Sequence, residues 1–218
     1  MRKYNPKVKI CCILSKKEAD IAIKAGASAL GLVSEMPSGP GIISEEEIKD
    51  IAEYVPAHID TFLLTSLRDA EAIIRQHKYC NTTTIQFVDS IKPNIYQFLR
   101  KKLPQIKFVQ VIHVMNQNSI KEALEITSYV DALLLDSGNP NLKTKKLGGT
   151  GRVHNWELSR QICELVSLPV YLAGGLNPNN VREAINFVKP YGLDICSGLR
   201  TNGKLDPVKI VTFFSNIN

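Results

Sequence analysis

The sequence lacks the features of membrane, disulfide-rich and polymer-binding proteins. No apolar run approaches the roughly 20 residues of a membrane-spanning helix, and the basic N-terminal residues precede a run of only strand length. The five cysteines are odd in number and lack zinc-type spacing, which predicts reduced thiols in a cytoplasmic protein. The 27 lysines and arginines exceed the 21 acidic residues but are scattered, with no aromatic ladder and no run that resembles a nucleic-acid-binding arm, so a small phosphorylated or carboxylated ligand fits the charge as well as a polymer does.

Signatures of common catalytic classes are also missing. The chain has no GxSxG, Walker A or HExxH sequence, which argues against the hydrolases, nucleotide-binding enzymes and zinc peptidases that use them. His58, His77 and His154 have no partners at metal-ligand spacing, and His113 is only weakly suggestive, so we predict no metal site.

Short apolar runs alternate with amphipathic stretches from one end of the chain to the other. Eight such units, each of about 25 residues, are typical of the (β/α)8 TIM barrel, and no linker or change in composition divides residues 1–218 into two domains. A doubly wound sheet is the alternative, because it uses the same units but more often has five or six strands. The expected strands are residues 8–14, 28–34, 58–65, 83–88, 107–114, 131–136, 169–174 and 192–198. The expected helices are residues 16–26, 44–54, 67–78, 93–103, 117–128, 155–166, 178–188 and 206–216.

Several of these helices carry recognisable start and stop signals. Two are capping boxes, two place a cap residue before a proline at the first helical position, and one is a glycine that ends a helix, in that order in the list that follows. They are Ser15 with Glu18, Ser44 with Glu47, Asn177-Pro178, Asp206-Pro207 and Gly26.

Glycine-bearing turns follow the last two expected strands, in residues 172–181 (LAGGLNPNNV) and 196–207 (CSGLRTNGKLDP). Backbone N–H groups near helix starts favour anions, and in barrels the loops after strands seven and eight usually bind phosphate. One such turn would indicate only a tight bend, but two at matching places predict a phosphate site.

Asp136 closes the sixth expected strand, directly after a run of apolar residues. Partial burial raises the pKa of a carboxyl group, so Asp136 is a candidate general acid or base, and capping of the next loop is the alternative. The connection that follows is the longest in the chain, and its glycines and lysines are consistent with a lid or with a solvated basic loop.

Cys11 and Cys12 adjoin each other near the end of the first expected strand. Side chains alternate between the two faces of a strand, so we expect only one of these cysteines to face the barrel interior. By itself a cysteine in an apolar strand is usually a small core residue.

These motifs together resemble those of the phosphoribosylanthranilate isomerase family. The resemblance rests on VKIC in the first strand, AGASALGLV in the second, LLLD…GGTGRVHNW after the sixth, LAGGLNPNNV after the seventh and PYGLDICSGLR…G…DPVKI near the end. It spans nearly the whole chain, and the last two motifs are quite specific.

The resemblance implies an aldose–ketose isomerase of tryptophan biosynthesis that needs no metal or cofactor. Such an enzyme converts N-(5-phosphoribosyl)anthranilate into 1-(2-carboxyphenylamino)-1-deoxyribulose 5-phosphate by an Amadori rearrangement. Asp136 would be the general acid that protonates the furanose ring oxygen, and Cys11 the general base that removes the C2 proton. The implied partner is a small phosphorylated sugar-amine, with neither a nucleic acid nor a membrane, and the protein would be a monomer or a homodimer.

The resemblance also implies which residues bind the substrate. Gly174, Gly175, Ser197 and Gly198 would hold the phosphate. Further substrate contacts would come from Lys9, Gln86, Gly149 and Asp194.

Three departures from the family pattern concern the anthranilate end of the substrate. Cys12 stands where the family usually has glycine, Gly41 stands where it usually has an arginine for the anthranilate carboxylate, and residues 86–89 read QFVD in place of QLHG. Two alternatives therefore stay open: an isomerase acting on a different phosphorylated sugar adduct, and a non-catalytic barrel that binds a phosphorylated ligand.

Overall fold

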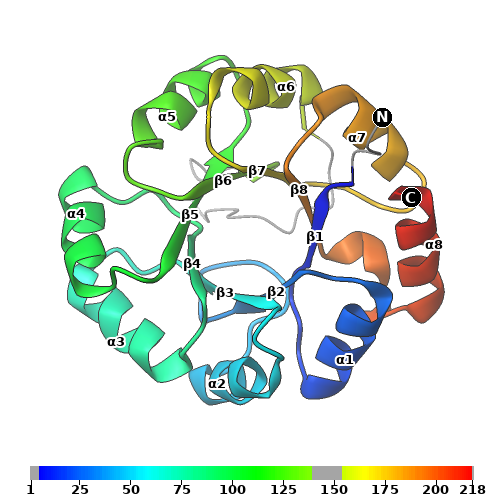
Figure 1. Cartoon of the computed structure of the whole chain (residues 1–218), viewed down its shortest axis with the longest axis horizontal. Coiled ribbons are helices and arrows are strands. Elements are labelled where there is room, and N and C mark those ends of the chain that lie inside the picture. Colours follow the sequence, from blue (N-terminus) through cyan, green and yellow to red (C-terminus); the bar gives the residue numbers. More distant parts are fainter. Residues whose placement is uncertain (1–4, 139–153, 218) are drawn as a thin grey trace.

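A computed structural model describes residues 5–138 and 154–217, which form a closed parallel barrel surrounded by helices (Figure 1). The barrel strands are β1 (Lys7–Ile10), β2 (Ala29–Val33), β3 (Asp60–Thr65), β4 (Thr84–Phe87), β5 (Lys107–His113), β6 (Ala132–Asp136), β7 (Val170–Leu172) and β8 (Gly192–Ile195). The helices are α1 (Lys16–Ala25), α2 (Glu45–Tyr54), α3 (Ala70–Cys80), α4 (Pro93–Lys102), α5 (Asn118–Ile126), α6 (Trp156–Leu165), α7 (Val181–Val188) and α8 (Pro207–Ile217). A short 3-10 helix, η1 (Ser197–Leu199), and a hairpin of β9 (Arg200–Thr201) and β10 (Lys204–Leu205) precede α8.

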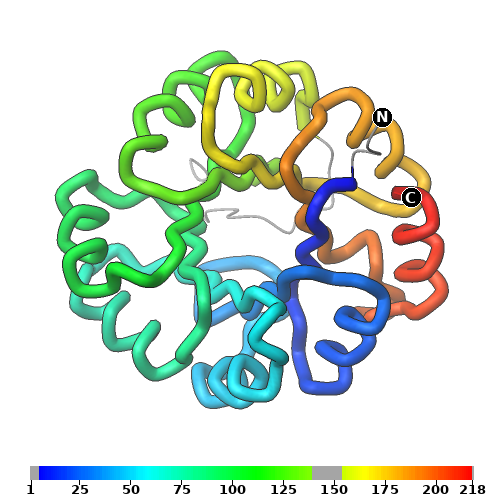
Figure 2. Tube along the Cα trace, in the orientation of Figure 1, coloured from blue at the N-terminus to red at the C-terminus, as the bar shows by residue number. Residues whose placement is uncertain are grey.

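Pairing between the first and last strands closes the sheet and confirms the predicted (β/α)8 barrel. β1 pairs in parallel with β8, and Lys9 lies opposite Asp194 in that register. A doubly wound sheet would instead leave two open edges. Because β1 and β8 are neighbours, α8 lies beside α1 and completes the ring of helices (Figure 2).

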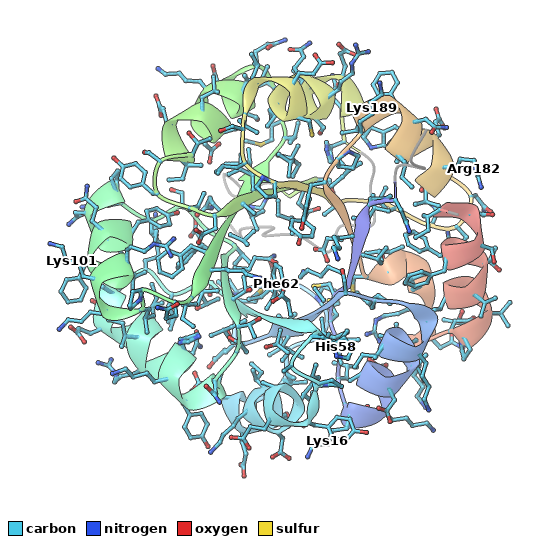
Figure 3. The ribbon with its side chains drawn as sticks, in the orientation of Figure 1. Lys16, His58, Phe62, Lys101, Arg182 and Lys189 are labelled. Carbon is cyan, nitrogen blue, oxygen red and sulfur yellow. The ribbon has the colours of Figure 1, made fainter. Side chains whose placement is uncertain are left out.

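The strands bury apolar side chains on both faces, as expected for parallel strands covered by helices. Phe62, Val111 and Leu134 belong to a cluster inside the barrel, whereas Leu63, Ile112 and Leu135 pack between the barrel and the helices. Figure 3 shows Phe62 within the ring of strands and Lys101 and Arg182 at the outer rim. The period-two alternation therefore determines which strand residues can reach a site in the barrel mouth.

The capping predictions are confirmed at α2 and modified at α1. Ser44 and Glu47 form a reciprocal capping box. Ser15 caps α1 by accepting from the Glu18 N–H, but the Glu18 carboxylate accepts from the Leu14 N–H and not from Ser15 itself. Gly26 ends α1 with φ 109°, a left-handed conformation that favours glycine.

The seventh helix begins later than predicted. Pro178 was expected at its first position, but α7 starts at Val181 and residues 178–180 form a turn. The turn is stabilised locally, because the Asn180 side chain accepts from the Asn177 N–H and donates to the Gly175 carbonyl.

The first strand ends at Ile10, four residues earlier than predicted, and this overturns the expectation for the two cysteines. Cys12 has φ 62°, so the backbone leaves the extended conformation and the alternation of side chains stops. Cys11 and Cys12 both belong to the cluster inside the barrel. In the described ranges no helix is long and apolar enough to cross a membrane.

Candidate active site

A cavity opens at the carboxyl-terminal ends of the strands, where barrel enzymes carry their active groups. All eight barrel strands, or the loops that follow them, contribute residues to its wall. Those that carry polar or thiol groups, or glycine turns, are Cys11, Cys12, Ser38, Gly39, Gln86, Asp136, Gly174, Gly175, Asp194, Cys196 and Ser197. Cys11 and Asp136 therefore face the same cavity from nearly opposite sides of the barrel.

Asp136 is the last residue of β6 and is 8% exposed. Burial is the largest influence on its carboxyl group, and it raises the pKa although a hydrogen bond from the Ser137 N–H to Oδ1 (2.7 Å) opposes it. A raised pKa keeps a carboxylic acid protonated at higher pH, which is what a general acid requires.

The Cys11 thiol lies beside a buried ion pair. Lys9 is 0% exposed and donates to Asp194 Oδ1 at 2.8 Å. A Cβ placed on Gly31 would lie 2.7 Å from Cys11 Sγ and 3.0 Å from Lys9 Nζ, so both atoms converge on that glycine. Burial by itself lowers the pKa of Lys9, but Asp194 and Cys11 raise it further than burial lowers it. The lysine therefore stays charged beside the Cys11 thiol.

Cys12 occupies the space beside Gly41. A Cβ on Gly41 would lie 2.4 Å from Cys12 Cβ, and Gly41 has φ 79°. Interactions with the thiols of Cys11 and Cys196, together with burial, raise the pKa of Cys12. Cys12 is therefore a neutral thiol that fills part of the cavity wall.

The two glycine turns meet at the proposed phosphate site. Gly174 and Gly175 have φ values of 78° and 68°, and within the described chain no acceptor pairs with their backbone N–H groups. A Cβ on Gly198 would lie 2.0 Å from the Leu176 carbonyl oxygen, so only glycine allows the two turns to approach this closely. Free N–H groups in such a concave turn can bind an anion.

The four other predicted substrate contacts lie in different places. Gln86 and Asp194 line the cavity. Lys9 does not: its ammonium group is buried against Asp194 and the Phe62 ring, and its contact with substrate stays a prediction. Gly149 lies outside the described residues. Among the residues that are described, no group of three or more His, Cys, Asp or Glu side chains could hold a metal ion.

Sequence reasoning missed one ion pair that supports the site. Arg200 in β9 donates to both carboxylate oxygens of Glu18, at 3.0 and 2.9 Å, and also to the Cys12 carbonyl. The two side chains are only 8% and 12% exposed. The Asn202-Gly203 turn, with both residues at positive φ, is the one sequence signal for the hairpin that carries Arg200.

The sequence matches a known family over nearly its whole length. A family model described as N-(5'phosphoribosyl)anthranilate (PRA) isomerase matches residues 8–216. The chain belongs to the N-(5'-phosphoribosyl)anthranilate isomerase family.

Curated members of the phosphoribosylanthranilate isomerase family match nearly the whole of this chain. N-(5'-phosphoribosyl)anthranilate isomerase 2 of Methanosarcina mazei is 37% identical over 209 residues, which cover 95% of this chain and 92% of that protein. The isomerase of Methanothrix thermoacetophila is 32% identical over 211 residues, or 97% of each chain.

Solved structures of phosphoribosylanthranilate isomerases share the fold. The enzyme from Thermotoga maritima superposes with a TM-score of 0.83 at 27% identity, covering 97% of this chain and 98% of that one. Another phosphoribosylanthranilate isomerase structure, in complex with reduced 1-(o-carboxyphenylamino)-1-deoxyribulose 5-phosphate, gives a TM-score of 0.80 at 25% identity with the same coverage.

Proposed function

We propose that this chain catalyses the Amadori rearrangement of N-(5-phosphoribosyl)anthranilate to 1-(2-carboxyphenylamino)-1-deoxyribulose 5-phosphate, a step of tryptophan biosynthesis. The observation that carries the proposal is the presence of Cys11 and Asp136 in one cavity with the two glycine turns. Membership of the isomerase family supports the same reaction.

In the first step Asp136 acts as the general acid. Its proton passes to the furanose ring oxygen, the bond from that oxygen to C1 breaks, and the nitrogen lone pair forms the C1=N bond of a protonated Schiff base. The Ser137 N–H on Oδ1 holds the carboxyl group in place. The raised pKa of Asp136 supplies the protonated form.

In the second step Cys11 acts as the general base. Its thiolate takes the proton from C2, the C–H electron pair forms the C1=C2 bond, and the nitrogen becomes neutral. The resulting enolamine gains a proton at C1 and loses the proton of its C2 hydroxyl to become the ketone. Lys9, held by Asp194, would stabilise the thiolate without contacting the sugar.

The phosphate of the substrate would bind to the two glycine turns. Gly174, Gly175, Ser197 and Gly198 would hold it through backbone N–H groups, and these place the sugar between the acid and the base. Gln86 and Asp194, both in the cavity wall, would contact the rest of the substrate.

Complementation of a tryptophan auxotroph that lacks this isomerase tests the proposal. We expect the wild-type chain to restore growth and both Cys11→Ala and Asp136→Asn to abolish it. Cys163→Ala on α6 is the matched control, because that thiol lies outside the cavity. Failure of the wild-type chain would overturn the assignment of substrate.

One observation favours a second candidate, an isomerase that acts on a different phosphorylated sugar adduct. The contact between Cys12 and Gly41 leaves no room for a side chain at position 41. An anthranilate carboxylate would then need another partner. Turnover of an aniline adduct at least as fast as that of the anthranilate adduct by the purified chain would favour this candidate.

The assembly and location of the protein are proposals of the same kind. A structure of the Thermotoga maritima isomerase is described as one of mutually generated monomers of a dimeric enzyme, which supports a monomer or homodimer here. All five cysteines are free thiols, which supports a cytoplasmic location.

A further inference from the structure

His113, at the end of β5, occupies a position next to the proposed acid that the reaction as described does not use. It lies opposite Asp136 in the register of β5 and β6. Val109 and Val111 point into the barrel, so alternation directs His113 to the same side, at the level of Asp136. The side chain is 5% exposed and does not line the cavity itself.

The hydrogen bonds of His113 determine which nitrogen carries the proton. Nε2 lies 3.1 Å from the Val88 carbonyl oxygen. A carbonyl only accepts, so Nε2 is protonated and the neutral ring carries a free lone pair on Nδ1. Nδ1 is buried and has no hydrogen-bond partner among the described residues. The ring therefore has one vacant site for a proton.

Few charged groups act on this pair of side chains. The charged groups that act on His113 are Asp136 on β6 and Asp89 after β4. Asp136 is in turn influenced by His113 and by Asp194 on β8. Burial lowers the pKa of His113, although both carboxylates oppose that effect. Burial also raises the pKa of Asp136. Both effects favour a protonated carboxyl group beside a neutral imidazole before the reaction begins.

Proton donation by Asp136 changes this balance. It leaves a buried carboxylate whose Oδ1 accepts hydrogen bonds from the N–H and the hydroxyl of Ser137. A buried carboxylate without a positive partner is costly. The vacant Nδ1 of His113, on the strand residue opposite Asp136, offers a place where a compensating proton can bind.

We propose that His113 is a positioning residue that acts through Asp136: when Asp136 has given its proton to the substrate, Nδ1 takes up a proton from water, and the imidazolium neutralises the carboxylate. The proton then returns to Asp136, directly or through a water molecule, and the ring becomes neutral again. Each turnover takes one proton from water at this pair, which balances a proton that the substrate releases elsewhere. The inference rests on the proposed role of Asp136 as the acid.

NMR titration of the histidine rings tests whether the two groups share protons. We expect the ring signals of His113 in the wild-type chain to shift twice with pH, once as the ring titrates and once as the Asp136 carboxyl group titrates, whereas Asp136→Asn should show only the transition of the ring. Loss of the signal in His113→Asn assigns the resonance. Identical titration of His113 in the wild type and in Asp136→Asn would overturn the proposal, and this measurement needs no substrate.

Kinetics of His113→Asn test the consequence for the reaction. Asparagine keeps an N–H for the Val88 carbonyl but cannot take up a proton. We expect kcat to fall by about tenfold, less than the 10²–10⁴ typical of a lost acid or base, while KM stays unchanged. An unchanged kcat would overturn the role.

His77 provides a matched control for this variant. It is also 5% exposed, its Nε2 bonds to the Thr82 carbonyl at 2.8 Å, and its Nδ1 is buried without a partner in the described part of the chain. Within residues 5–138 and 154–217, no carboxylate contributes to the shift in its pKa. An equal loss of kcat in His77→Asn would show that disturbed packing is responsible and would overturn the role of His113. A wild-type chain without turnover would count against the proposed function and not against the proton sharing.

Discussion

The two adjacent cysteines differ because one backbone angle separates them. Cys11 follows the extended strand and reaches the cavity beside Lys9, whereas Cys12 turns into the same interior at φ 62°. An L-residue in this conformation is strained by roughly 1–2 kcal/mol relative to glycine. The side chain of Cys12 then packs against Gly41, so these two positions depend on each other.

A double-mutant cycle measures that dependence. We expect Gly41→Arg to lower the free energy of unfolding by about 2–4 kcal/mol, because the new Cβ would overlap Cys12 and position 41 has positive φ. Cys12→Gly removes the overlap, so the double variant should be more stable than the sum of the single changes predicts. Urea unfolding of all four chains gives the coupling, and strictly additive effects would contradict the contact.

At the scale of elements, the hairpin of β9 and β10 fastens the loop that follows β1. Arg200 bonds to Glu18 at the start of α1 and to the Cys12 carbonyl. Burial by itself raises the pKa of Glu18, but hydrogen bonds from Arg200 and from the Leu14 N–H lower it below its usual value. The ion pair therefore connects the first and last βα units, which are neighbours in the closed barrel.

Removing the Glu18 charge should loosen this connection. In Glu18→Gln the buried guanidinium loses its counter-ion, and we expect the free energy of unfolding to fall by roughly 3 kcal/mol and kcat to fall several-fold as the β1 loop shifts. The exposed pair of Lys16 and Asp50 is the control, since Asp50→Asn should cost less than about 0.5 kcal/mol. Equal effects of the two changes in urea unfolding would refute a structural role for the buried pair.

For the whole molecule, buried neutral histidines determine the response to mild acid. Burial lowers the pKa of His77 and His113, and it lowers the pKa of His154 from 6.5 to about 4. Between pH 6.5 and about 4, His154 binds a proton in the unfolded chain but not in the folded chain. Stability is therefore complete above the unfolded pKa and is lost as the pH falls.

We accordingly expect the free energy of unfolding to decrease steadily from pH 6.5 to about 4, the range given by His154. His154→Asn should be less stable at pH 7.5 but should lose less stability on acidification. The exposed His58 supplies the control, because His58→Asn should leave the pH dependence as in the wild type. Urea midpoints at pH 7.5, 6.0 and 4.5 provide the measurement, and equal midpoints at all three values would contradict the expectation.

The alternation of apolar strands and amphipathic helices was enough to predict the barrel, because burial on both faces leaves a strong local pattern. Asp136 and the two glycine turns were also recognisable, since Asp136 ends a strand and each turn comes shortly after one. The predicted end of the first strand was wrong, because nothing local marks the left-handed conformation of Cys12. The late start of α7 was missed for a similar reason, since side-chain bonds of Asn177 and Asn180 override the proline signal.

The sequence by itself determined the barrel and the end of it at which the site lies, because periodicity and strand ends are local properties. Only the tertiary structure decided which residues meet there. Lys9 and Asp194 are 185 residues apart, and Arg200 and Glu18 are 182 apart, yet each pair is in contact. Closure of the barrel brings the first and last units together, and the charges at the site depend on these distant contacts, which no local pattern encodes.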